Sequence, residues 1–133
     1  MTQRLFVYGT LRRDSRHSMF HLLARHAEFE GRARIRGRLY DLGEYPGVLI
    51  TTDRSRWVHG DVYTLKNADE ALARLDEYEG CGPGDPKPHE FEPVMDDAVL
   101  EDGRIKRVWV YVYRGALDGK QEIPSGDYFE RTL

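Results

Sequence analysis

Apolar residues occur along the chain in short runs, and most of these runs follow the two-residue period of a β-strand. Residues 4 to 8 are largely apolar and end at Gly9, which predicts a short buried strand. Between residues 31 and 39, arginines alternate with glycine and aliphatic residues. This alternation predicts a strand with one cationic face and one apolar face. Two more short strands are predicted at residues 48 to 51 and 60 to 65.

A three-to-four-residue spacing of apolar positions predicts two helices. The first covers residues 18 to 25, and the second covers residues 67 to 79. Asn67 and Glu70 have the spacing of a capping pair, and Gly80 stands where a C-terminal cap belongs. The apolar stripe of the second helix consists of Ala68, Ala71, Leu72, Leu75 and Tyr78.

After the second helix the pattern predicts a loop and then a hairpin. Residues 80 to 88 hold three glycines and three prolines, too many for a helix or a central strand. Residues 91 to 100 and 104 to 114 have strand patterns, and Asp102 with Gly103 between them is a hairpin signal. The later run is apolar or aromatic on both faces, which predicts a strand in the middle of a sheet.

Strands outnumber helices and do not alternate with them one for one. This order predicts an α+β fold, with a mixed, largely antiparallel curled sheet or small β-barrel and flanking helices. Residues 123 to 133 show no clear period and add no predicted element. No repeat or linker divides the sequence, so residues 1 to 133 are expected to form a single domain.

Composition and net charge exclude some classes of function. The chain of 133 residues is 40% hydrophobic and 32% charged, which suits a globular protein with a solvated surface. A formal net charge of -3 gives no general attraction to nucleic acid or to an anionic membrane, and we expect neither as a partner. Cys81 is the only cysteine and cannot form an internal disulfide, and we find no signal-peptide or membrane-span pattern. We therefore expect a cytoplasmic protein that is a monomer or a weak homodimer.

Glu79 is the carboxylate in the most informative position. Counting back four and seven residues along the predicted helix reaches Leu75 and Leu72, so Glu79 belongs to the apolar stripe. Burial, the negative end of the helix dipole and the nearby Asp76 and Glu77 all favour a raised pKa for this carboxyl group. Such a group suits general acid/base catalysis at neutral pH. The alternative is a solvated residue in a frayed last turn, and we interpret Asp76 and Glu77 as solvated.

A second candidate is the turn that follows the first strand. Its glycine allows the backbone to approach a ligand closely, and successive N–H groups in such a turn can hold an anionic or carbonyl oxygen. The alternative is a glycine that only permits a tight turn. The segment does not match a phosphate-binding loop, because it lacks the glycine repeat and the Lys-Ser/Thr pair. The turn consists of Tyr8, Gly9, Thr10 and Leu11.

Six short motifs resemble, in order and spacing, those of the gamma-glutamylcyclotransferase-like superfamily. The most specific pair is a Tyr-Gly-x-Leu turn after the first strand and an Asp-x-x-Glu-Gly about seventy residues later. The resemblance covers nearly the whole chain. The motifs are residues 6 to 12, 45 to 48, 60 to 63, 75 to 80, 110 to 113 and 123 to 127.

The resemblance implies a barrel-like sheet with a cavity in which residues 8 to 11 bind a small gamma-glutamyl substrate. It implies that Glu79 is the catalytic residue and that 5-oxoproline is released when the substrate's α-amine attacks its own γ-carbonyl. Tyr113, near a strand end, is a candidate for lining this cavity. No metal and no cofactor is implied. The short chain and the spelling of the turn look more like the gamma-glutamylamine branch than the glutathione-specific one.

One motif departs from the family pattern. Relatives usually carry Tyr-x-Arg after the catalytic glutamate, whereas this chain has Phe91, Glu92 and Pro93 behind a Gly/Pro-rich insertion. The departure bears on the leaving group, and so on the choice of substrate. Two other function classes stay open. One is a non-catalytic small-molecule binding protein that retains the cavity, and the other is an RNA-binding protein.

Three other signals carry less weight. His17 and His21 have helical spacing, but further zinc ligands at suitable spacing are missing, so we predict no metal site. Cys81 follows a predicted helix C-terminus, which disfavours the thiolate. A row of arginines on one strand face is the feature that an RNA-binding protein would use, and we interpret it as a solvated face. The row consists of Arg32, Arg34, Arg36 and Arg38.

Overall fold

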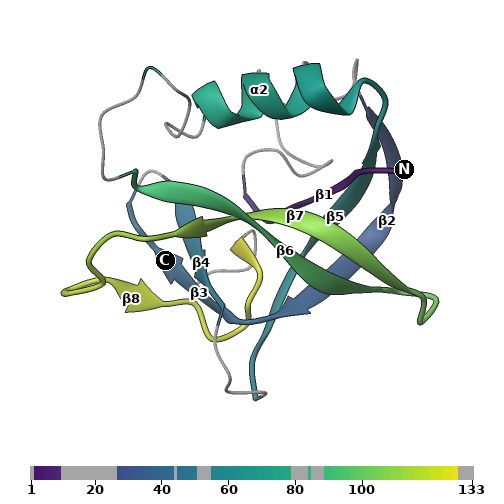
Figure 1. Ribbon diagram of the computed structural model, residues 1–133. Coiled ribbons are helices and arrows are strands. Elements are labelled where there is room, and N and C mark those ends of the chain that lie inside the picture. Colours follow the sequence, from purple (N-terminus) through teal and green to yellow (C-terminus); the bar gives the residue numbers. More distant parts are fainter. Residues whose placement is uncertain are drawn as a thin grey trace.

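The computed structural model shows eight strands and one helix in the described part of the chain. Five strands, in the order β1-β5-β2-β6-β7, close into a barrel (Figure 1). The described residues are 2–9, 27–43, 45–50, 55–78, 84 and 89–128. The barrel strands are β1 (Arg4–Val7), β2 (Ala27–Arg36), β5 (Trp57–Leu65), β6 (Phe91–Leu100) and β7 (Ile105–Tyr113).

β1 is the strand that closes the barrel. It pairs antiparallel with β5 along its whole length and meets β7 in parallel, with Leu5 opposite Trp109. The other neighbouring pairs, β5 with β2, β2 with β6 and β6 with β7, are all antiparallel. The prediction of a mixed, largely antiparallel sheet curled into a small barrel is therefore confirmed.

A smaller sheet of three strands has the order β4-β3-β8. It divides the strand that we predicted at residues 31 to 39, because β2 ends before Gly37 and β3 begins after it. A β-carbon on Gly37 would lie 2.9 Å from the carbonyl oxygen of Leu49, so the chain leaves the barrel at a point of close backbone approach. The strands of this sheet are β3 (Arg38–Asp41), β4 (Pro46–Leu49) and β8 (Gln121–Glu122).

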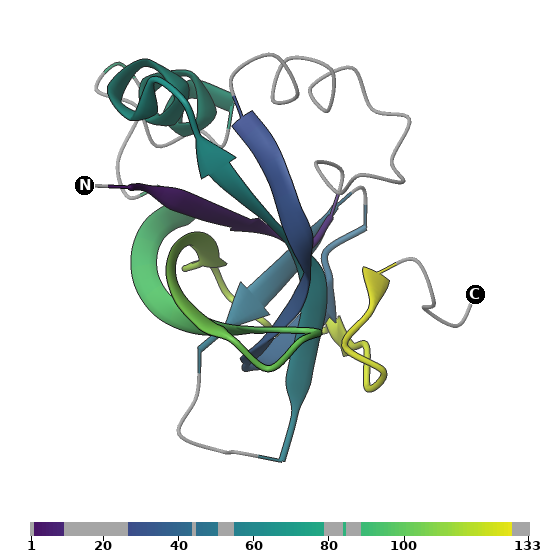
Figure 2. The ribbon, with the colours of Figure 1, turned by 90° about the vertical axis from the view of Figure 1, so that its right-hand side faces the viewer.

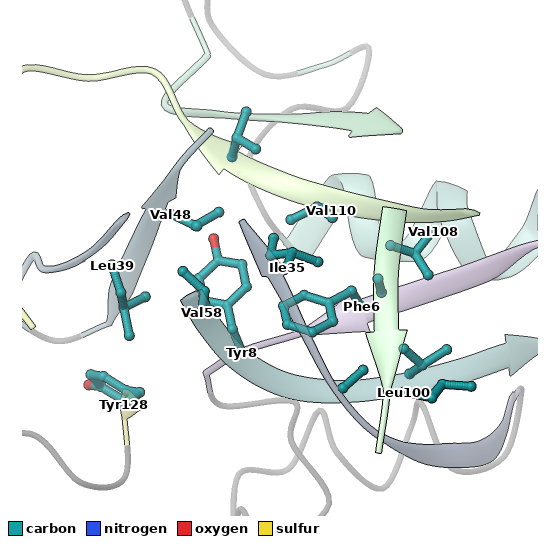
Figure 3. Packing of buried hydrophobic residues seen from close by; sticks show 14 of the residues in the cluster. Phe6, Tyr8, Ile35, Leu39, Val48, Val58, Leu100, Val108, Val110 and Tyr128 are labelled. Atoms are coloured by element: carbon teal, nitrogen blue, oxygen red, sulfur yellow. The ribbon is translucent and has the colours of Figure 1, made fainter. Parts of the chain in front are cut away.

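Two clusters of buried side chains follow from the alternation of residues along the barrel strands. One fills the barrel interior, where Figure 3 shows the rings of Phe6 and Tyr8 among aliphatic side chains. The other lies between the barrel wall and α2 (Ala68–Tyr78), where Leu5 packs in one cluster with Leu75. Successive residues of β1 therefore serve two different cores.

α2 lies at the top of both ribbon views, and the three-stranded sheet lies below it (Figures 1 and 2). The backbone N–H of Ala71 donates to the carbonyl of Asn67 over 2.9 Å, which begins the helical hydrogen bonding. Nδ2 of Asn67 donates to Oε2 of Glu70 at 2.9 Å, so the expected capping pair is in contact. Of the predicted apolar stripe, Ala71 and Leu75 are buried against the barrel.

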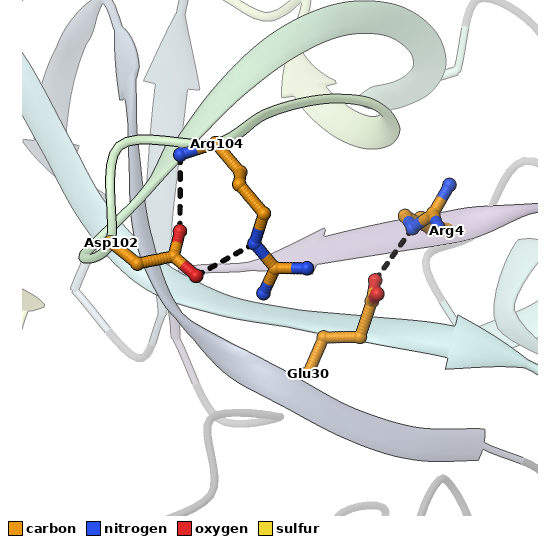
Figure 4. Close-up of polar contacts among 4 residues, drawn as sticks. All are labelled: Arg4, Glu30, Asp102 and Arg104. Carbon is orange, nitrogen blue, oxygen red and sulfur yellow. Dashed lines mark hydrogen bonds and ion pairs between the residues drawn. The ribbon is translucent and has the colours of Figure 1, made fainter.

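The predicted hairpin joins β6 to β7. Gly103 has a φ of 89°, a left-handed conformation that favours glycine. Asp102 accepts hydrogen bonds from the backbone N–H of Arg104 at 3.0 Å and from its Nε at 2.6 Å (Figure 4). The backbone hydrogen bond is the main reason why the pKa of the Asp102 carboxyl lies below its ordinary value, and the guanidinium adds to the effect. β7 lies between β6 and β1, which confirms that it is a central strand.

Two predicted elements cannot be compared with the structure. The helix predicted at residues 18 to 25 lies outside the described residues, and so does the loop at residues 80 to 88 apart from Gly84. β8 is an element that the sequence pattern did not predict.

Candidate active site

The predicted site residues that the structure describes lie at strand ends or directly after them. Tyr8 and Gly9 come directly after β1, and Tyr113 is the last residue of β7. Glu79, Thr10 and Leu11 lie outside the described residues. What the structure describes of the site is the region where the ends of β1 and β7 meet β4 and α2.

The end of β1 and the end of β7 both contact the start of β4. Gly9 is buried, and a β-carbon on it would lie 2.7 Å from Cγ of Pro46. A β-carbon on Gly47 would lie 2.9 Å from Cβ of Tyr113. Only glycine leaves room for such close approaches. Two glycines therefore bring together the Tyr-Gly turn, the Tyr-Pro-Gly motif and Tyr113, which are far apart in the sequence.

Tyr8 belongs to the barrel core, and its side chain is 7% exposed. Its hydroxyl donates a hydrogen bond to the backbone carbonyl of Tyr111 in β7. Its ring stacks with that of Phe6, with the two centroids 6.4 Å apart. A buried hydroxyl that has a partner holds its ring in one orientation. Tyr8 thus ties the end of β1 to β7 just before the turn.

Tyr111 connects β7 to α2 in addition. Its side-chain hydroxyl donates to Oδ1 of Asp76 over 2.5 Å. Asp76 is half-buried, so the expectation that it is solvated is wrong. The physical reason is that Asp76 follows Leu75 at the edge of the buried stripe, where a tyrosine on the outer face of β7 reaches it. The side chain of Glu77 lies outside the described residues.

Tyr113 is the end member of an aromatic row. The ring centroids of Phe91 and Tyr113 are 5.4 Å apart, and those of Tyr45 and Phe91 are 5.7 Å apart. The hydroxyl of Tyr45 donates to Oε1 of Glu90 at 2.8 Å, and that of Tyr113 donates to the carbonyl of Ala116 at 3.3 Å. Phe91 begins the segment in which the resemblance implies a departure from Tyr-x-Arg. The departure therefore lies in contact with a predicted site residue.

Sequence reasoning did not select Tyr45, Phe91 or Tyr111 as site residues. Tyr45 begins the Tyr-Pro-Gly motif, and Tyr111 lies in the aromatic motif of the last long strand. Their motifs were therefore visible, but the contacts that give them a role join segments distant in sequence. These contacts form only when the barrel brings the segments together, so the sequence pattern alone does not predict them.

The arginine row is only partly solvated. Nη1 of Arg38 lies 2.8 Å from Oε1 of Glu122, in an ion pair between β3 and β8. The guanidinium groups of Arg34 and Arg36 lie 4.3 and 3.7 Å from the centre of the Trp57 ring, within the range of cation–π attraction. The row therefore engages partners within the protein. This arrangement gives little support to the RNA-binding alternative.

An open pocket of about 410 Å³ lies on the barrel wall between β2, β5 and the hairpin of β6 and β7. None of its described lining residues belongs to the candidate site. Its lining carries charges of both signs and has no single electrostatic character. The ionisable residues that line it are Arg32, Arg34, His59, Glu101 and Asp127.

A metal centre and a membrane-spanning helix have no counterpart in the part of the chain that the structure describes. In the described ranges, no group of three or more His, Cys, Asp or Glu residues is arranged to hold a metal ion. His17, His21 and Cys81 lie outside those ranges. None of the helical structure described here is long and apolar enough to cross a membrane.

The fold is that of a known class of protein. A closed five-stranded barrel with a helix packed on it matches known structures over most of the chain. The crystal structure of YkqA from Bacillus subtilis aligns with a TM-score of 0.73 and 26% identity, covering 98% of this chain and 40% of YkqA. An AIG2-like protein from Mus musculus aligns with a TM-score of 0.70 and 25% identity, covering 88% of this chain and 81% of the mouse protein.

Sequence comparison leads to the same class. Residues 5–130 match the family model described as gamma-glutamyl cyclotransferase, AIG2-like. The gamma-glutamylcyclotransferase family protein YtfP from Escherichia coli K12 is 34% identical over 129 residues, which cover 96% of this chain and 97% of YtfP. The chain belongs to the gamma-glutamyl cyclotransferase, AIG2-like family.

Proposed function

We propose that this protein releases 5-oxoproline from a gamma-glutamyl amine or amino acid, with Glu79 as the general acid and base. Family membership supplies the reaction class and implies a small gamma-glutamyl substrate. The structural observation that supports the proposal most is the meeting of three family motifs at one end of the barrel. Gly9 packs on Pro46 and Gly47 packs on Tyr113, at strand ends that lie near the end of α2.

The reaction needs little machinery because the nucleophile is part of the substrate. The nitrogen of the α-amine attacks the γ-carbonyl carbon, and a new C–N bond closes a five-membered ring. The bond between that carbon and the leaving nitrogen then breaks. Holding the two reacting ends together supplies much of the rate enhancement.

Glu79 moves the proton that this exchange of bonds requires. The α-amine starts as an ammonium group, and its proton must leave before the nitrogen can attack. The leaving nitrogen must gain a proton as its bond to carbon breaks. One carboxyl group can accept the first proton and deliver it to the leaving nitrogen. The attacking nitrogen loses a second proton as the ring amide forms, and the departing amine takes up that proton to leave as an ammonium group, so the protons balance without a metal or a cofactor.

The turn after β1 holds the substrate in this proposal. Backbone N–H groups of the turn would bind the substrate carboxylate or the oxyanion that develops on the γ-carbonyl. The rigid contact between Gly9 and Pro46 favours such a role, because donors that are already in place need no reorganisation during the reaction. Tyr113 lines the same site. The turn residues in this role are Tyr8, Gly9, Thr10 and Leu11.

The test is release of 5-oxoproline from a panel of gamma-glutamyl amines, gamma-glutamyl amino acids and glutathione. The wild-type protein is expected to turn over at least one member, and Glu79→Gln is expected to lose nearly all activity. Glu79→Gln keeps the size of the side chain but cannot take up the proton. Undiminished turnover by Glu79→Gln would contradict the assigned mechanism. Stabilisation of the wild type by 5-oxoproline without any turnover would instead indicate a non-catalytic binding protein.

A further inference from the structure

Two hydrogen bonds that share Tyr111 link α2, β7 and β1. The Tyr111 hydroxyl donates to Oδ1 of Asp76 on α2, and the Tyr111 backbone carbonyl accepts from the hydroxyl of Tyr8. Tyr111 is therefore the common partner of the helix that leads into Glu79 and of the strand that leads into the substrate turn. Glu79 follows Asp76 by three residues in the sequence.

We propose that Asp76 and Tyr111 are positioning residues that hold the C-terminal part of α2 in register with the turn after β1. The proposal rests on the proposed function, because a positioning role can change the rate only if Glu79 is the catalytic group. Neither Asp76 nor Tyr111 needs to touch the substrate. Both act through the elements to which they belong.

The apolar contacts of α2 cannot supply this register by themselves. Ala71 and Leu75 bury one face of the helix against the barrel, and such burial is non-directional. A helix held only in this way can slide or rotate slightly at low cost. A hydrogen bond is directional, and one that ends on a carboxylate is among the stronger kinds. The link between Asp76 and Tyr111 therefore fixes where the helix ends along β7.

Burial strengthens the hydrogen bond between Tyr111 and Asp76. Tyr111 is 4% exposed, and Asp76 is half-buried, so water competes poorly for the bond. The salt bridge between Arg74 and Glu70 on the same helix is different, since both of its side chains are about half exposed. Exposed pairs of this kind contribute little. The chain thus offers a matched control on α2 itself.

The consequence for catalysis is large because the reaction depends on placement. A displacement of about 1 Å at the reacting groups can lower the rate by about 100-fold. We expect Asp76→Ala and Tyr111→Phe each to lower kcat by about 10- to 100-fold while KM changes little. The double variant should be no worse than the poorer single variant, because both changes break the same link.

Two further variants separate positioning from general stability. Asp76→Asn keeps a carbonyl oxygen at the acceptor position and should recover part of the kcat lost in Asp76→Ala. Arg74→Ala breaks the exposed salt bridge on α2, keeps the capping pair of Asn67 and Glu70, and should leave kcat unchanged. All rates are measured at a temperature at which circular dichroism shows every variant to be fully folded, so that loss of stability alone does not change kcat.

The outcomes distinguish this proposal from the one on which it rests. If wild type and Glu79→Gln are equally active, or if neither is active, the proposed function fails. If Glu79→Gln is inactive while Asp76→Ala and Tyr111→Phe keep the wild-type kcat, the positioning role fails alone. Multiplicative losses in the double variant would also overturn it, since they would show that the two side chains act independently.

Discussion

Tyr8 illustrates how one side chain serves both the core and the site. Its ring packs inside the barrel, and its hydroxyl reaches the backbone of β7. Tyr8→Phe removes only this hydroxyl and leaves the Tyr111 carbonyl without that donor. We expect the free energy of unfolding to fall by about 1 kcal/mol, the usual contribution of a buried hydrogen bond.

Urea denaturation monitored by circular dichroism measures this loss as a lower midpoint with an unchanged slope. Tyr113→Phe is a matched control, because the hydroxyl of Tyr113 makes a longer bond of 3.3 Å in a more exposed place. Water can replace that bond, so Tyr113→Phe should leave the midpoint nearly unchanged. Equal effects of the two variants would show that the buried bond of Tyr8 adds nothing to stability.

Gly9 is a residue whose lack of a side chain is required by its surroundings. A β-carbon at this position would lie 2.7 Å from Cγ and 3.0 Å from Cδ of Pro46. The proline ring is rigid and buried, so Gly9→Ala must push β4 away from the end of β1. We expect a loss of about 1 to 3 kcal/mol in the free energy of unfolding, as for other overpacked sites.

Thermal unfolding compares Gly9→Ala with Gly84→Ala. A β-carbon on Gly84 would meet nothing within 4 Å, so the same substitution should be tolerated there. An unchanged melting temperature for Gly9→Ala would mean that Pro46 yields more easily than its packing indicates.

The sequence predicts the structural setting of a single residue best where that setting depends on its neighbours in the sequence. The end of β1 just before Tyr8 and Gly9 was predicted because a glycine that ends an apolar run marks the end of a strand, while the binding role of Gly9 stays a prediction. Asp76 was misassigned because helix spacing shows which face a residue belongs to, but not whether a tyrosine from another strand reaches that face. Its partner Tyr111 lies 35 residues away. Glu79, Thr10 and Leu11 remain predictions.

At the scale of elements, the hairpin between β6 and β7 is the clearest product of local sequence. Asp102 accepts the backbone N–H of Arg104, and Gly103 supplies the positive φ that the turn requires. The carboxylate form is favoured by that hydrogen bond, so the pKa of Asp102 is lowered in the folded state. The hairpin is therefore stabilised above the pKa of the unfolded chain, about 3.9, and loses this stabilisation as the pH falls through the lower, folded-state pKa.

An NMR titration of the side-chain carboxyl carbons tests this expectation. Asp102 should titrate below the ordinary value for aspartate, and Arg104→Ala should shift its pKa only partly back, because the backbone N–H remains. Asp102→Asn should show a smaller loss of stability between pH 4 and lower pH than the wild type. A titration of Asp102 at the ordinary value would contradict the role of the turn hydrogen bond.

Prediction of strands from periodicity made two kinds of error: it joined two strands into one, and it missed a very short strand. The run at residues 31 to 39 has one uninterrupted alternation, yet the structure divides it at Gly37 between two sheets. Alternation of polar and apolar residues shows which face of a strand is buried. Because β2 and β3 each bury one face, the alternation continues across Gly37 and does not reveal that the chain passes there from one sheet to another. β8 has two residues, Gln121 and Glu122, which is too short for any period. It pairs with β3 because the chain passes its edge, and local sequence does not encode that path.

At the scale of the whole molecule, closure of the barrel is a long-range event. β1 pairs with β5 on one side and with β7 on the other, more than fifty residues away in both cases. Nε1 of Trp109 donates to Gln3 at 2.8 Å, and Arg4 forms an ion pair of 2.6 Å with Glu30 (Figure 4). The sequence predicted a sheet that curls, but which strand closes it depends on contacts that appear only in the folded chain.

Gly60 in β5 lies where closure of the barrel brings two backbones close together. A β-carbon on Gly60 would overlap the carbonyl oxygen of Val7 and would lie 2.7 Å from Cζ of Phe6. Val7 and Phe6 are part of β1, so Gly60→Ala cannot be relieved by rotating a flexible side chain. β1 would have to move away from β5, and the barrel would open at its closing strand. We expect a loss of about 3 kcal/mol or more in the free energy of unfolding.

Opening at β1 should damage the site before it damages the hairpin, because β1 carries Tyr8 and Gly9 whereas β6 and β7 pair along nine positions. Amide hydrogen exchange on Gly60→Ala should therefore show lost protection in β1 and β5 and retained protection in the hairpin. Gly84→Ala again serves as the control. Uniform loss of protection in every strand would show instead that the barrel unfolds as one unit, with no weaker seam at β1.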